Sequence, residues 1–275
     1  MAAADSTSPT SHRRIRLTSF VKGSVGLHLG AGIATLAAPH LWPWAVGGLV
    51  ADHALLAFGG LWPRSQWYGS NWMHLPDVPA ARSAISLTFD DGPDPAVTPQ
   101  VLDMLDAASV KATFFCIGTR VIEHAALARE IVQRGHALEN HSHRHVHTFS
   151  VSGPRAMRRE IVGAQQIIAD ITGVRPRCFR APAGLRNPFL DPLLQQLDLQ
   201  LVSWTRRGFD TRERDPARVS ARLLNGLASR DILLLHDGHA ARTAEGRPVV
   251  LDVLPTLLDA VRRAQLKPLL LRELL

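Results

Sequence analysis

The stretch Ile85-Ser86-Leu87-Thr88-Phe89-Asp90-Asp91-Gly92-Pro93 joins a short apolar run to two adjacent carboxylates and a turn. The apolar run predicts a buried strand, and Gly92-Pro93 forces the chain to turn after it. Two carboxylates at the end of a buried strand are costly unless a cation or hydrogen bonds compensate them. The stretch therefore predicts a strand that ends in a chemical site, with a turn whose carboxylate caps a helix as the simpler alternative.

Short apolar runs alternate with longer amphipathic segments throughout the region after residue 83. We expect strands at residues 85–89, 112–117, 137–139, 178–180, 199–204, 232–235 and 268–271. We expect helices at residues 99–108, 120–134, 153–172, 188–197, 216–229 and 248–264. This alternation predicts an α/β domain with a parallel sheet, which in a domain of about 190 residues can close or nearly close into a barrel.

Polar clusters follow several of these strands in the same position as the Asp pair. They are Asn140-His141-Ser142-His143-Arg144-His145-Val146-His147, Arg180-Ala181-Pro182-Ala183-Gly184, Trp204 with Asp210 in the loop after it, and Leu235-His236-Asp237. His141 and His145 are four residues apart, which would present both imidazoles on one side of a helical turn, as a metal site requires. Because α/β sheets and barrels place their sites at the carboxyl ends of strands, we expect these clusters to converge.

In this order, the motifs resemble those of the polysaccharide deacetylase family, whose shared domain is the NodB homology domain. The resemblance covers about residues 85–271 and rests on TFDDGP at 88–93, HSxxH at 141–145, RxPxG at 180–184 and LxH at 234–236. It implies a distorted (β/α) barrel of seven or eight strands. It also implies a carbohydrate esterase family 4-like hydrolase, which removes N-acetyl groups from N-acetylhexosamine units of a glycan or lipid-linked sugar and releases acetate.

The resemblance implies a divalent metal, usually zinc, held by Asp91, His141 and His145. Two His and one carboxylate leave the fourth position of the metal for water, which is the arrangement of catalytic zinc sites. Such a metal lowers the pKa of the water and polarises the acetamide carbonyl. We expect His143 and His147, the other histidines of the cluster, not to bind the metal.

The resemblance also assigns the proton-transfer residues. Asp90 corresponds to the general base, and Arg180 to the residue that pairs with this carboxylate. His236 corresponds to the general acid that protonates the leaving amine, and Asp210 to the acidic residue that orients this histidine. A base and an acid in separate environments are what amide hydrolysis requires.

The substrate-binding positions implied by the resemblance are Pro182, Ala183, Gly184 and Trp204. Ala183 stands where family members often carry an aromatic residue, at a position whose backbone N–H points at the developing oxyanion. The main-chain donor survives this substitution, whereas an aromatic wall is lost, so a more open substrate site is expected. We expect Trp204 to line the acetyl pocket and His239, in the loop after His236, to face solvent.

The part of the chain before the barrel divides into a polar basic tail (residues 1–23), an apolar helical hairpin (24–63) and a connector (64–83), followed by the catalytic domain (84–275). Apolar stretches at 25–41 and 41–62 predict a hairpin associated with a bacterial inner membrane. Cations precede the first stretch and resume at Arg64, with none in the turn. This pattern favours a cytoplasmic-facing catalytic domain.

Other arrangements of residues 24–63 remain open. A signal peptide fits poorly because two apolar stretches are separated by Pro39 and Pro43. A single span with a periplasmic catalytic domain remains possible because the first stretch is short. Asp52-His53 is costly in lipid, so a third arrangement is an amphipathic hairpin that lies in the membrane interface.

Composition and charge limit the partners. The net charge is +7, but Arg residues are scattered and no basic run is interleaved with aromatics, which argues against nucleic-acid binding. Cys116 and Cys178 form no CxxC pair, so we expect two small buried side chains and no cysteine-based zinc site or disulfide framework.

The substrate depends on the side of the membrane. A cytoplasmic catalytic domain would act on a polyprenyl-phosphate-linked amino sugar, and a basic surface would favour its phosphate. An external domain would act on peptidoglycan or an exported poly-N-acetylhexosamine. Two other functional classes are a non-catalytic glycan-binding protein, which would lack Asp90 or His236, and a metal phosphodiesterase, which would need more carboxylate ligands or a second metal.

Overall fold

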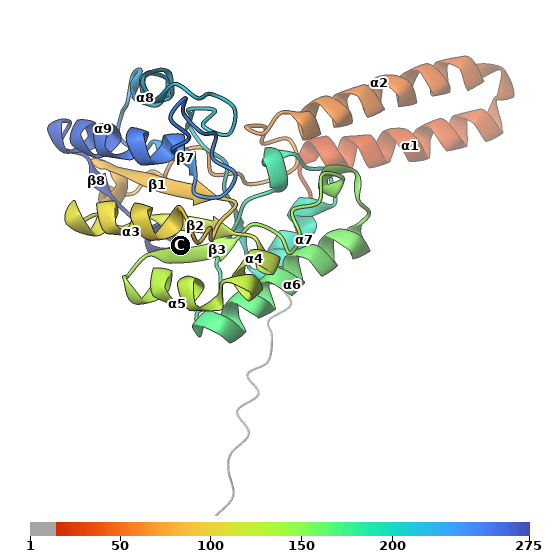
Figure 1. Cartoon of the computed structure of the whole chain (residues 1–275). Helices are drawn as coiled ribbons and strands as arrows, with labels where there is room; N and C mark the ends of the chain where they lie inside the picture. The colour runs from red at the N-terminus through yellow and green to blue at the C-terminus, as the bar shows by residue number, and fades with distance from the viewer. Residues whose placement is uncertain (1–14) are drawn as a thin grey trace, which may run out of the picture.

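An apolar pair of helices projects from an α/β body (Figure 1). The computed structural model describes residues 15–275, so most of the expected polar tail lies outside the described residues. Helices α1 (Ser19–Ala37) and α2 (Trp42–Leu61) are joined by a 3-10 turn at Pro39–Leu41. Helix α1 begins inside the segment expected to be tail because Thr18 caps it, accepting a hydrogen bond from the backbone N–H of Val21.

The body is built on one sheet of eight strands. These are β1 (Ala84–Asp90), β2 (Thr113–Cys116), β3 (Ala137–Asn140), β4 (Cys178–Phe179), β5 (Gln200–Leu201), β6 (Arg206–Arg207), β7 (Ile232–His236) and β8 (Lys267–Pro268). Their order is β5-β4-β3-β2-β1-β7-β6, β8 pairs with the start of β1, and every pair is parallel. The expected α/β fold with a curled, barrel-like parallel sheet is confirmed. Strand β6 was not expected, because two arginines carry no apolar pattern.

The connector links β5, at one end of the sheet, to the start of β7, which is the strand next to the other end. Trp72 forms a parallel bridge with Val202, just after β5, and His74 forms an antiparallel bridge with Asp231, just before β7. The N–H of Leu75 also donates to the carbonyl of Arg230 at 2.9 Å. Residues 72–75 therefore join β5 to β7 where no strand-to-strand ladder does, and the connector is an integral part of the barrel wall.

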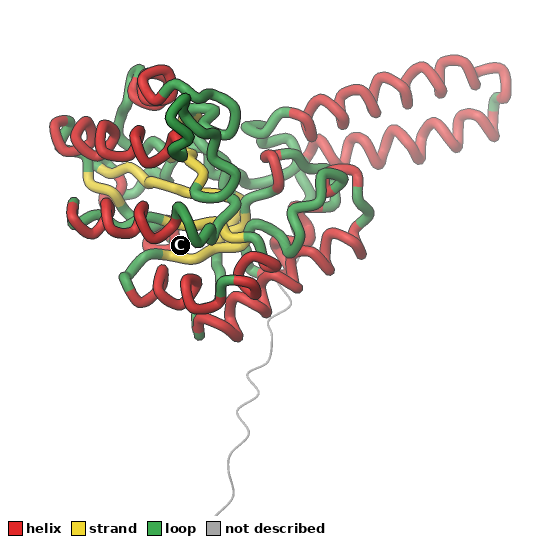
Figure 2. Tube along the Cα trace, viewed as in Figure 1, coloured by secondary structure: helices red, strands yellow, loops and turns green. Residues whose placement is uncertain are grey.

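Helices cover the outer face of the sheet (Figure 2). They are α3 (Thr98–Ala107), α4 (Gly118–Glu123), α5 (Ala125–Gln133), α6 (Pro154–Thr172), α7 (Leu190–Leu197), α8 (Pro216–Leu224) and α9 (Val249–Arg263). Pro in the first turn of α3, α6 and α8 supplies a φ that suits the start of a helix. The single helix expected at 120–134 is two helices, because His124 leaves the helical region with φ −123° and ψ 46°.

The alternation of side chains along β1 separates two regions of the interior. Leu87 and Phe89 are fully buried among the apolar side chains of the covering helices. Thr88 and Asp90 point the other way, into the barrel, where both bind Arg180. Alternate side chains of β1 thus pack in the core on one face of the sheet, whereas Asp90 lies in the barrel interior on the other face.

The base of the hairpin is fastened to the barrel beside α7. The N–H of Arg186 donates to the carbonyl of Gly60 at 3.1 Å, and Gln195 exchanges two hydrogen bonds with the backbone of Arg16. Between the helices, Ser24 Oγ donates to Asp52 Oδ2 at 2.7 Å, which compensates the carboxylate within the apolar pair. By length and composition alone, both helices could cross a membrane.

Candidate active site

The three residues expected to bind a metal converge at the carboxyl ends of β1 and β3. Asp91, His141 and His145 each offer a ligand atom, and these atoms lie within 4.8 Å of one another. Asp91 Oδ1 is 3.3 Å from His141 Nε2 and 3.4 Å from His145 Nε2. His143 and His147 are outside this group. Strands β1 and β3 flank β2, so parallel pairing brings these distant segments to one edge.

The segment that carries the two histidines is not helical, which corrects the expected helical turn. Ser142 and His145 have left-handed backbones, with φ of 65° and 52°. Asn140 Oδ1 accepts the N–H of Ser142 at 2.9 Å, and Ser142 Oγ accepts the N–H of His145 at 3.0 Å. These side-chain bonds replace helical backbone bonds and hold a tight turn that still brings the two imidazoles together.

The protonation of the three residues suits a divalent metal. His141 Nδ1 is 2.8 Å from the carbonyl of Arg180, which accepts the Nδ1 proton and leaves Nε2 toward Asp91. Burial disfavours the imidazolium of His141, but Asp90 and Asp91 outweigh burial and raise its pKa, and a bound cation would replace the Nε2 proton. Burial, reinforced by His141, lowers the pKa of His145 to about 4, so this imidazole is neutral at pH 7. Burial disfavours ionised Asp91, but the neighbouring His141 and His239 outweigh it and hold its pKa below the usual range.

One buried oxygen supports the same conclusion. Asp91 Oδ1, the atom closest to both histidine Nε2 atoms, is buried and receives no hydrogen bond. A buried carboxylate oxygen without a donor is costly, and a cation removes that cost. Two imidazole nitrogens and one carboxylate form a ligand set typical of catalytic zinc. Asp91, His141 and His145 therefore fit a divalent metal.

Asp90 is held by a fully buried arginine. Arg180 Nη1 donates to Asp90 Oδ1 at 2.6 Å and to Thr88 Oγ1 at 2.8 Å, and Nη2 donates to the carbonyl of Ser203 at 2.8 Å. The guanidinium also stacks 4.1 Å from the ring centroid of Phe115. Asp90 Oδ2 lies on the other side, 3.9 Å from His141 Nε2. One oxygen of Asp90 is thus fixed, while the other faces the metal ligands.

His236 lies opposite Asp90, because these two residues are paired in the register of β1 and β7. Asp210, fully buried, contacts the Nδ1 atom and the backbone N–H of His236. Burial opposes the imidazolium, but the Asp210 carboxylate outweighs it and raises the pKa of His236 to about 9. His236 is therefore protonated at neutral pH. The structure thus brings Asp210, which follows Trp204 at a distance in the sequence, to this histidine.

The expected substrate-binding positions form one packed unit. Pro182 and Gly184 are buried, and Trp204 is only 7% exposed. Gly184 has φ +73°, and a Cβ there would lie 2.6 Å from the Trp204 ring, so only glycine fits. Ala183, with φ 54°, is exposed beside them. The loop at 182–184 is thus shaped against Trp204, with the Ala183 methyl group at the surface.

Sequence reasoning missed two features of this edge, the buried Asp237 and the contact of His239 with Asp91. Asp237 is fully buried, accepts Thr98 Oγ1 at 2.6 Å, and has its pKa raised to about 7 by burial. His239 was expected to face solvent; its side chain is 59% exposed, yet Nδ1 lies 3.3 Å from Asp91 Oδ2. The signal that could have revealed them is the repeated Asp-Gly pair after β1 and β7.

The glycines of these pairs allow the two strand ends to meet. A Cβ at Gly92 would lie 2.1 Å from Asp237 Oδ2, and a Cβ at Gly238 would lie 2.1 Å from the carbonyl of Asp91. Because any larger residue would push the two ends apart, glycine is required at both positions. The close approach places Asp91 and His239 in contact.

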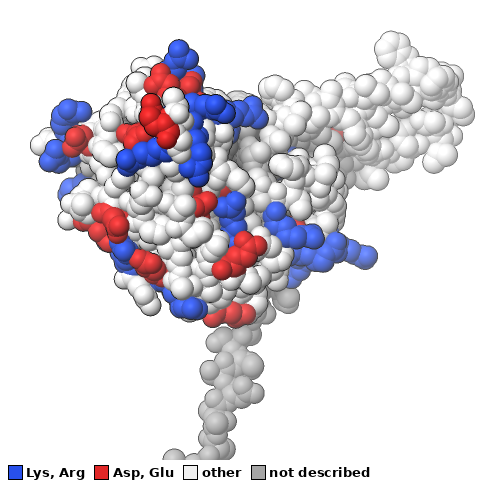
Figure 3. Space-filling model, in the orientation of Figure 1, with Lys and Arg blue, Asp and Glu red and all other residues white. Residues whose placement is uncertain are grey.

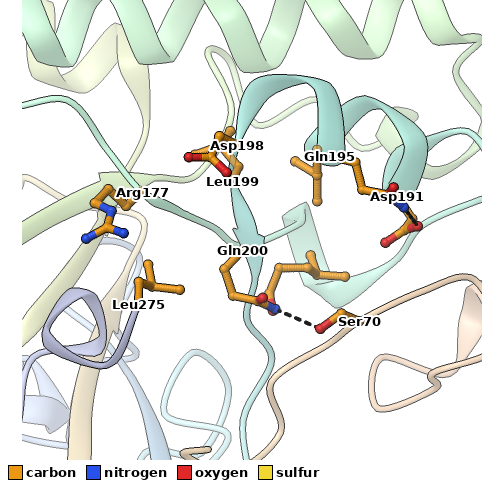
Figure 4. Close-up of a pocket in the computed structure, with 10 residues that line it drawn as sticks. Ser70, Arg177, Asp191, Gln195, Asp198, Leu199, Gln200 and Leu275 are labelled. Carbon is orange, nitrogen blue, oxygen red and sulfur yellow. Dashed lines mark hydrogen bonds between the residues drawn. The ribbon is translucent and has the colours of Figure 1, made fainter. Parts of the chain in front are cut away.

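A cavity of about 390 Å³ lies elsewhere, between α7 and the outer strands (Figure 4). Its lining includes Arg177 and Asp198, which lie just before β4 and β5, together with Gln195 of α7 and Leu275. None of the residues expected at the active site lines this cavity. The candidate catalytic residues instead gather at the opposite, carboxyl end of the strands.

Comparison with known proteins gives the same family by independent routes. The profile described as "Polysaccharide deacetylase" matches residues 77–202. Peptidoglycan-N-acetylglucosamine deacetylase PgdA of Listeria monocytogenes is 34% identical over 172 residues, which make up 62% of this chain and only 36% of that protein. The chain thus spans about a third of the length of that relative. Chitooligosaccharide deacetylase of Bradyrhizobium is 33% identical over 194 residues, covering 68% of this chain and 88% of that protein.

A solved structure shares the fold. Peptidoglycan deacetylase PdaC from Bacillus subtilis superposes with a TM-score of 0.60 at 28% sequence identity. The superposition covers 72% of this chain and 93% of that one. The similarity therefore extends over nearly the whole of the solved chain and most of this one.

Proposed function

The chain belongs to the polysaccharide deacetylase family, and from that premise we propose that it is a metal-dependent N-deacetylase. Its reaction is hydrolysis of the acetamide of an N-acetylhexosamine unit, with release of acetate. The observation that carries the proposal is the meeting of three metal-ligand side chains with Asp90 and His236 at one edge of the sheet. Zinc is the metal that we propose, because the ligands are two imidazoles and one carboxylate.

Asp90 is placed to act as the general base. Asp91, His141 and His145 would hold the divalent metal, which would polarise the acetamide carbonyl and lower the pKa of the attacking water. Arg180 occupies Oδ1 of Asp90 at 2.6 Å, so Oδ2, on the side of the metal ligands, is the oxygen that takes the proton from this water. The fixed ion pair also prevents the carboxylate from turning away from the site.

His236 is placed to act as the general acid. Its Nδ1 is bound to Asp210, so the proton available to a substrate is the one on Nε2. With a pKa near 9, the imidazolium is the dominant form at neutral pH and can protonate the leaving nitrogen. Asp90 gains one proton and His236 loses one, so the products are acetate and a free sugar amine. As the resemblance implies, the backbone N–H of Ala183, an exposed residue, is proposed to donate to the developing oxyanion.

The two other functional classes receive less support. A non-catalytic member would lack the base or the acid, whereas this chain has both Asp90 and His236, each bound to a buried partner. A two-metal phosphodiesterase would need a second ligand group at the same edge. Among residues 64–275, only one group of three or more ligand residues is present.

We further propose that α1 and α2 insert into a bacterial inner membrane, with the barrel on the cytoplasmic side and the periplasmic side as the alternative. The support is the length and apolar character of both helices and the position of the cationic residues before and after them. A cytoplasmic barrel would act on a polyprenyl-linked amino sugar, whereas a periplasmic one would act on peptidoglycan or another N-acetylated glycan. No nucleic-acid partner is proposed.

Acetate release tests the activity. The full chain, purified in detergent and loaded with zinc, would be incubated separately with an N-acetylchitooligosaccharide, peptidoglycan and a polyprenyl-phosphate-linked N-acetylhexosamine. We expect acetate from at least one substrate, loss of that activity in Asp90→Asn, and normal activity in Asp103→Asn, a change at an exposed carboxylate on α3. Failure of the loaded protein to release acetate from all three would overturn the proposed function.

A further inference from the structure

We propose that the barrel rests on the bilayer that holds the hairpin, with the loops after β3 and β4 in the lipid headgroup region. The substrate is then an amino sugar tethered to that membrane, presented to the catalytic edge from the membrane surface. This inference rests on the proposed function and on insertion of the hairpin. It adds the orientation of the active site toward the membrane and the class of substrate that this orientation selects.

The hairpin leaves the barrel beside the active site. The strands of the sheet point toward the side from which α1 and α2 project (Figure 1). Pro63, just after α2, lies 2.7 Å from where a Cβ of Gly184 would stand, and its carbonyl accepts Ser203 Oγ at 2.7 Å. Gly60, at the end of α2, binds the N–H of Arg186. An inserted hairpin therefore holds the 182–184 loop at the membrane surface.

The loops around this attachment expose apolar side chains. Val151, between β3 and α6, is 79% exposed, and Phe189, between β4 and α7, is 51% exposed. The two loops are joined by a hydrogen bond of 2.9 Å from Asn187 Nδ2 to the carbonyl of Ser152. Trp62, at the end of α2, is 46% exposed. Transfer of such apolar side chains from water into the interface of a bilayer is favourable.

The exposed apolar residues are unevenly distributed over the barrel. Within residues 64–275, large apolar side chains are exposed at Val78, Ile122, Val151, Val162, Phe189, Phe209 and Leu275. Three of these seven, Val151, Phe189 and Phe209, lie between a strand and the helix that follows it, and Ile122 lies in the short helix α4, which begins soon after β2. The connections that carry Val151, Phe189 and Phe209 follow the carboxyl ends of strands, so exposed apolar side chains lie on the catalytic edge.

Cationic side chains flank the apolar loops. Arg155, Arg158 and Arg159 are exposed in the first two turns of α6, directly after the loop that carries Val151. Within residues 15–275, none of the three forms an ion pair. Figure 3 shows blue side chains gathered over this end of α6, whereas the hairpin surface is almost free of charged residues. Each cation near an anionic membrane surface contributes about 1 kcal/mol, so this end of the barrel is attracted to the bilayer.

Fluorescence quenching from within the lipid tests the docked orientation. The two native cysteines are buried, so one introduced cysteine can be labelled selectively. The full chain carrying Val151→Cys or Phe189→Cys would be labelled with an environment-sensitive dye. It would then be reconstituted into vesicles containing an anionic phospholipid and a spin-labelled quencher lipid. The control is Ala107→Cys, exposed at the end of α3 on the opposite edge.

We expect several-fold stronger quenching at positions 151 and 189 than at position 107. Equal quenching at all three, while the chain floats with the vesicles, would overturn the docked orientation and leave the hairpin inserted. A chain that does not float with the vesicles would overturn insertion, and the docked orientation with it. Neither reading depends on catalysis.

A substrate comparison tests the consequence for activity. The double variant Val151→Asp/Phe189→Asp should keep its kcat/KM on a soluble N-acetylchitooligosaccharide in detergent. On a polyprenyl-linked N-acetylhexosamine in vesicles its kcat/KM should fall by about tenfold or more, because two apolar anchors become charged. Equal losses on both substrates, or no loss on either, would overturn the inference. Absence of acetate release by the unmodified chain would instead overturn the proposed function, while the quenching result would stand.

Discussion

Both carboxylate oxygens of Asp210 contact His236. Asp210 Oδ1 lies 2.8 Å from His236 Nδ1, and Oδ2 accepts the backbone N–H of His236 at 2.7 Å. Two bonds from one buried carboxylate fix the imidazole ring, leave Nε2 toward the site, and stabilise the charged form of His236 against burial. The ionisation of this histidine should therefore be visible in the pH dependence of activity.

We expect kcat/KM to fall on the alkaline side as the pH rises through about 9. The pKa of His236 is raised to about 9, so the proton-donating form is present below that pH and is lost above it. In Asp210→Asn the stabilising charge is gone, and the alkaline limb should move to lower pH with a lower kcat. Asp259→Asn, at an exposed position of α9, serves as the control. An alkaline limb unchanged in Asp210→Asn would assign the acid to another group.

Substitution of the proposed metal ligands should have a different effect on zinc binding from substitution of the other histidines in the same loop. We expect His141→Ala and His145→Ala to lose bound zinc, because each removes one of three ligands, whereas His143→Ala and His147→Ala should keep it. Metal content of the purified full chain, measured beside its circular dichroism, decides between them. Full zinc retention in a folded His141→Ala protein would contradict the assignment.

Asp90 and Asp91 are adjacent but should behave differently. Asp90→Asn should keep the metal and lose activity by about a hundredfold or more, because it removes a base and leaves the ligands in place. Asp91→Asn should lose both. Metal content and acetate release are measured on the same samples. Near-normal turnover in Asp90→Asn would place the base elsewhere.

The buried ion pair predicts an effect on stability. Arg180→Ala leaves the Asp90 carboxylate buried without its partner, and removing one member of such a pair typically costs about 3–5 kcal/mol. Arg180→Ala/Asp90→Asn should recover part of this loss because the unpaired charge is removed. Urea unfolding of the two variants gives the comparison. A double variant no more stable than Arg180→Ala would show that packing of Arg180 on Phe115, and not its charge, accounts for the loss.

The hairpin can be removed while the connector, which pairs with the sheet, is kept. A shortened chain that starts at Arg64 should be soluble, folded and able to bind metal, because it keeps the bridges of Trp72 and His74 to the sheet. It loses the hydrogen bonds of Arg186 to Gly60, of Ser203 to Pro63 and of Gln195 to Arg16, each worth about 1 kcal/mol. A chain that starts at Ser83 lacks these bridges and should not fold stably. Circular dichroism, solubility and metal content compare the two chains, and failure of the longer one to fold would make residues 15–63 part of the barrel core.

Membrane attachment of the full chain should resist both high salt and carbonate. Salt screens electrostatic adsorption of a basic domain, whereas an inserted apolar hairpin does not respond to it. The measurement is the fraction of the full chain that sediments with membranes before and after each wash. Release by either wash would show that α1 and α2 are not inserted.

The sequence alone was sufficient for the class of fold and for most of the site. Apolar runs of strand length and amphipathic runs of helix length are local patterns, and they predicted seven of the eight strands. The clusters of Asp90-Asp91, His141 with His145, Arg180 and His236 stand at strand ends, and a parallel sheet brings such ends together. Local periodicity and the rule for parallel sheets were enough to predict their convergence.

The tertiary structure decided what depends on register and loop conformation. The left-handed backbones of Ser142 and His145, the contact of His239 with Asp91, and the bridge of Trp72 to Val202 leave no periodic signal in the sequence. Each depends on where segments far apart in the chain are placed by the sheet, and on side-chain bonds that replace regular backbone bonds. The orientation of the active site toward the hairpin has the same origin, because it follows from the packing of α2 against the 184–186 loop.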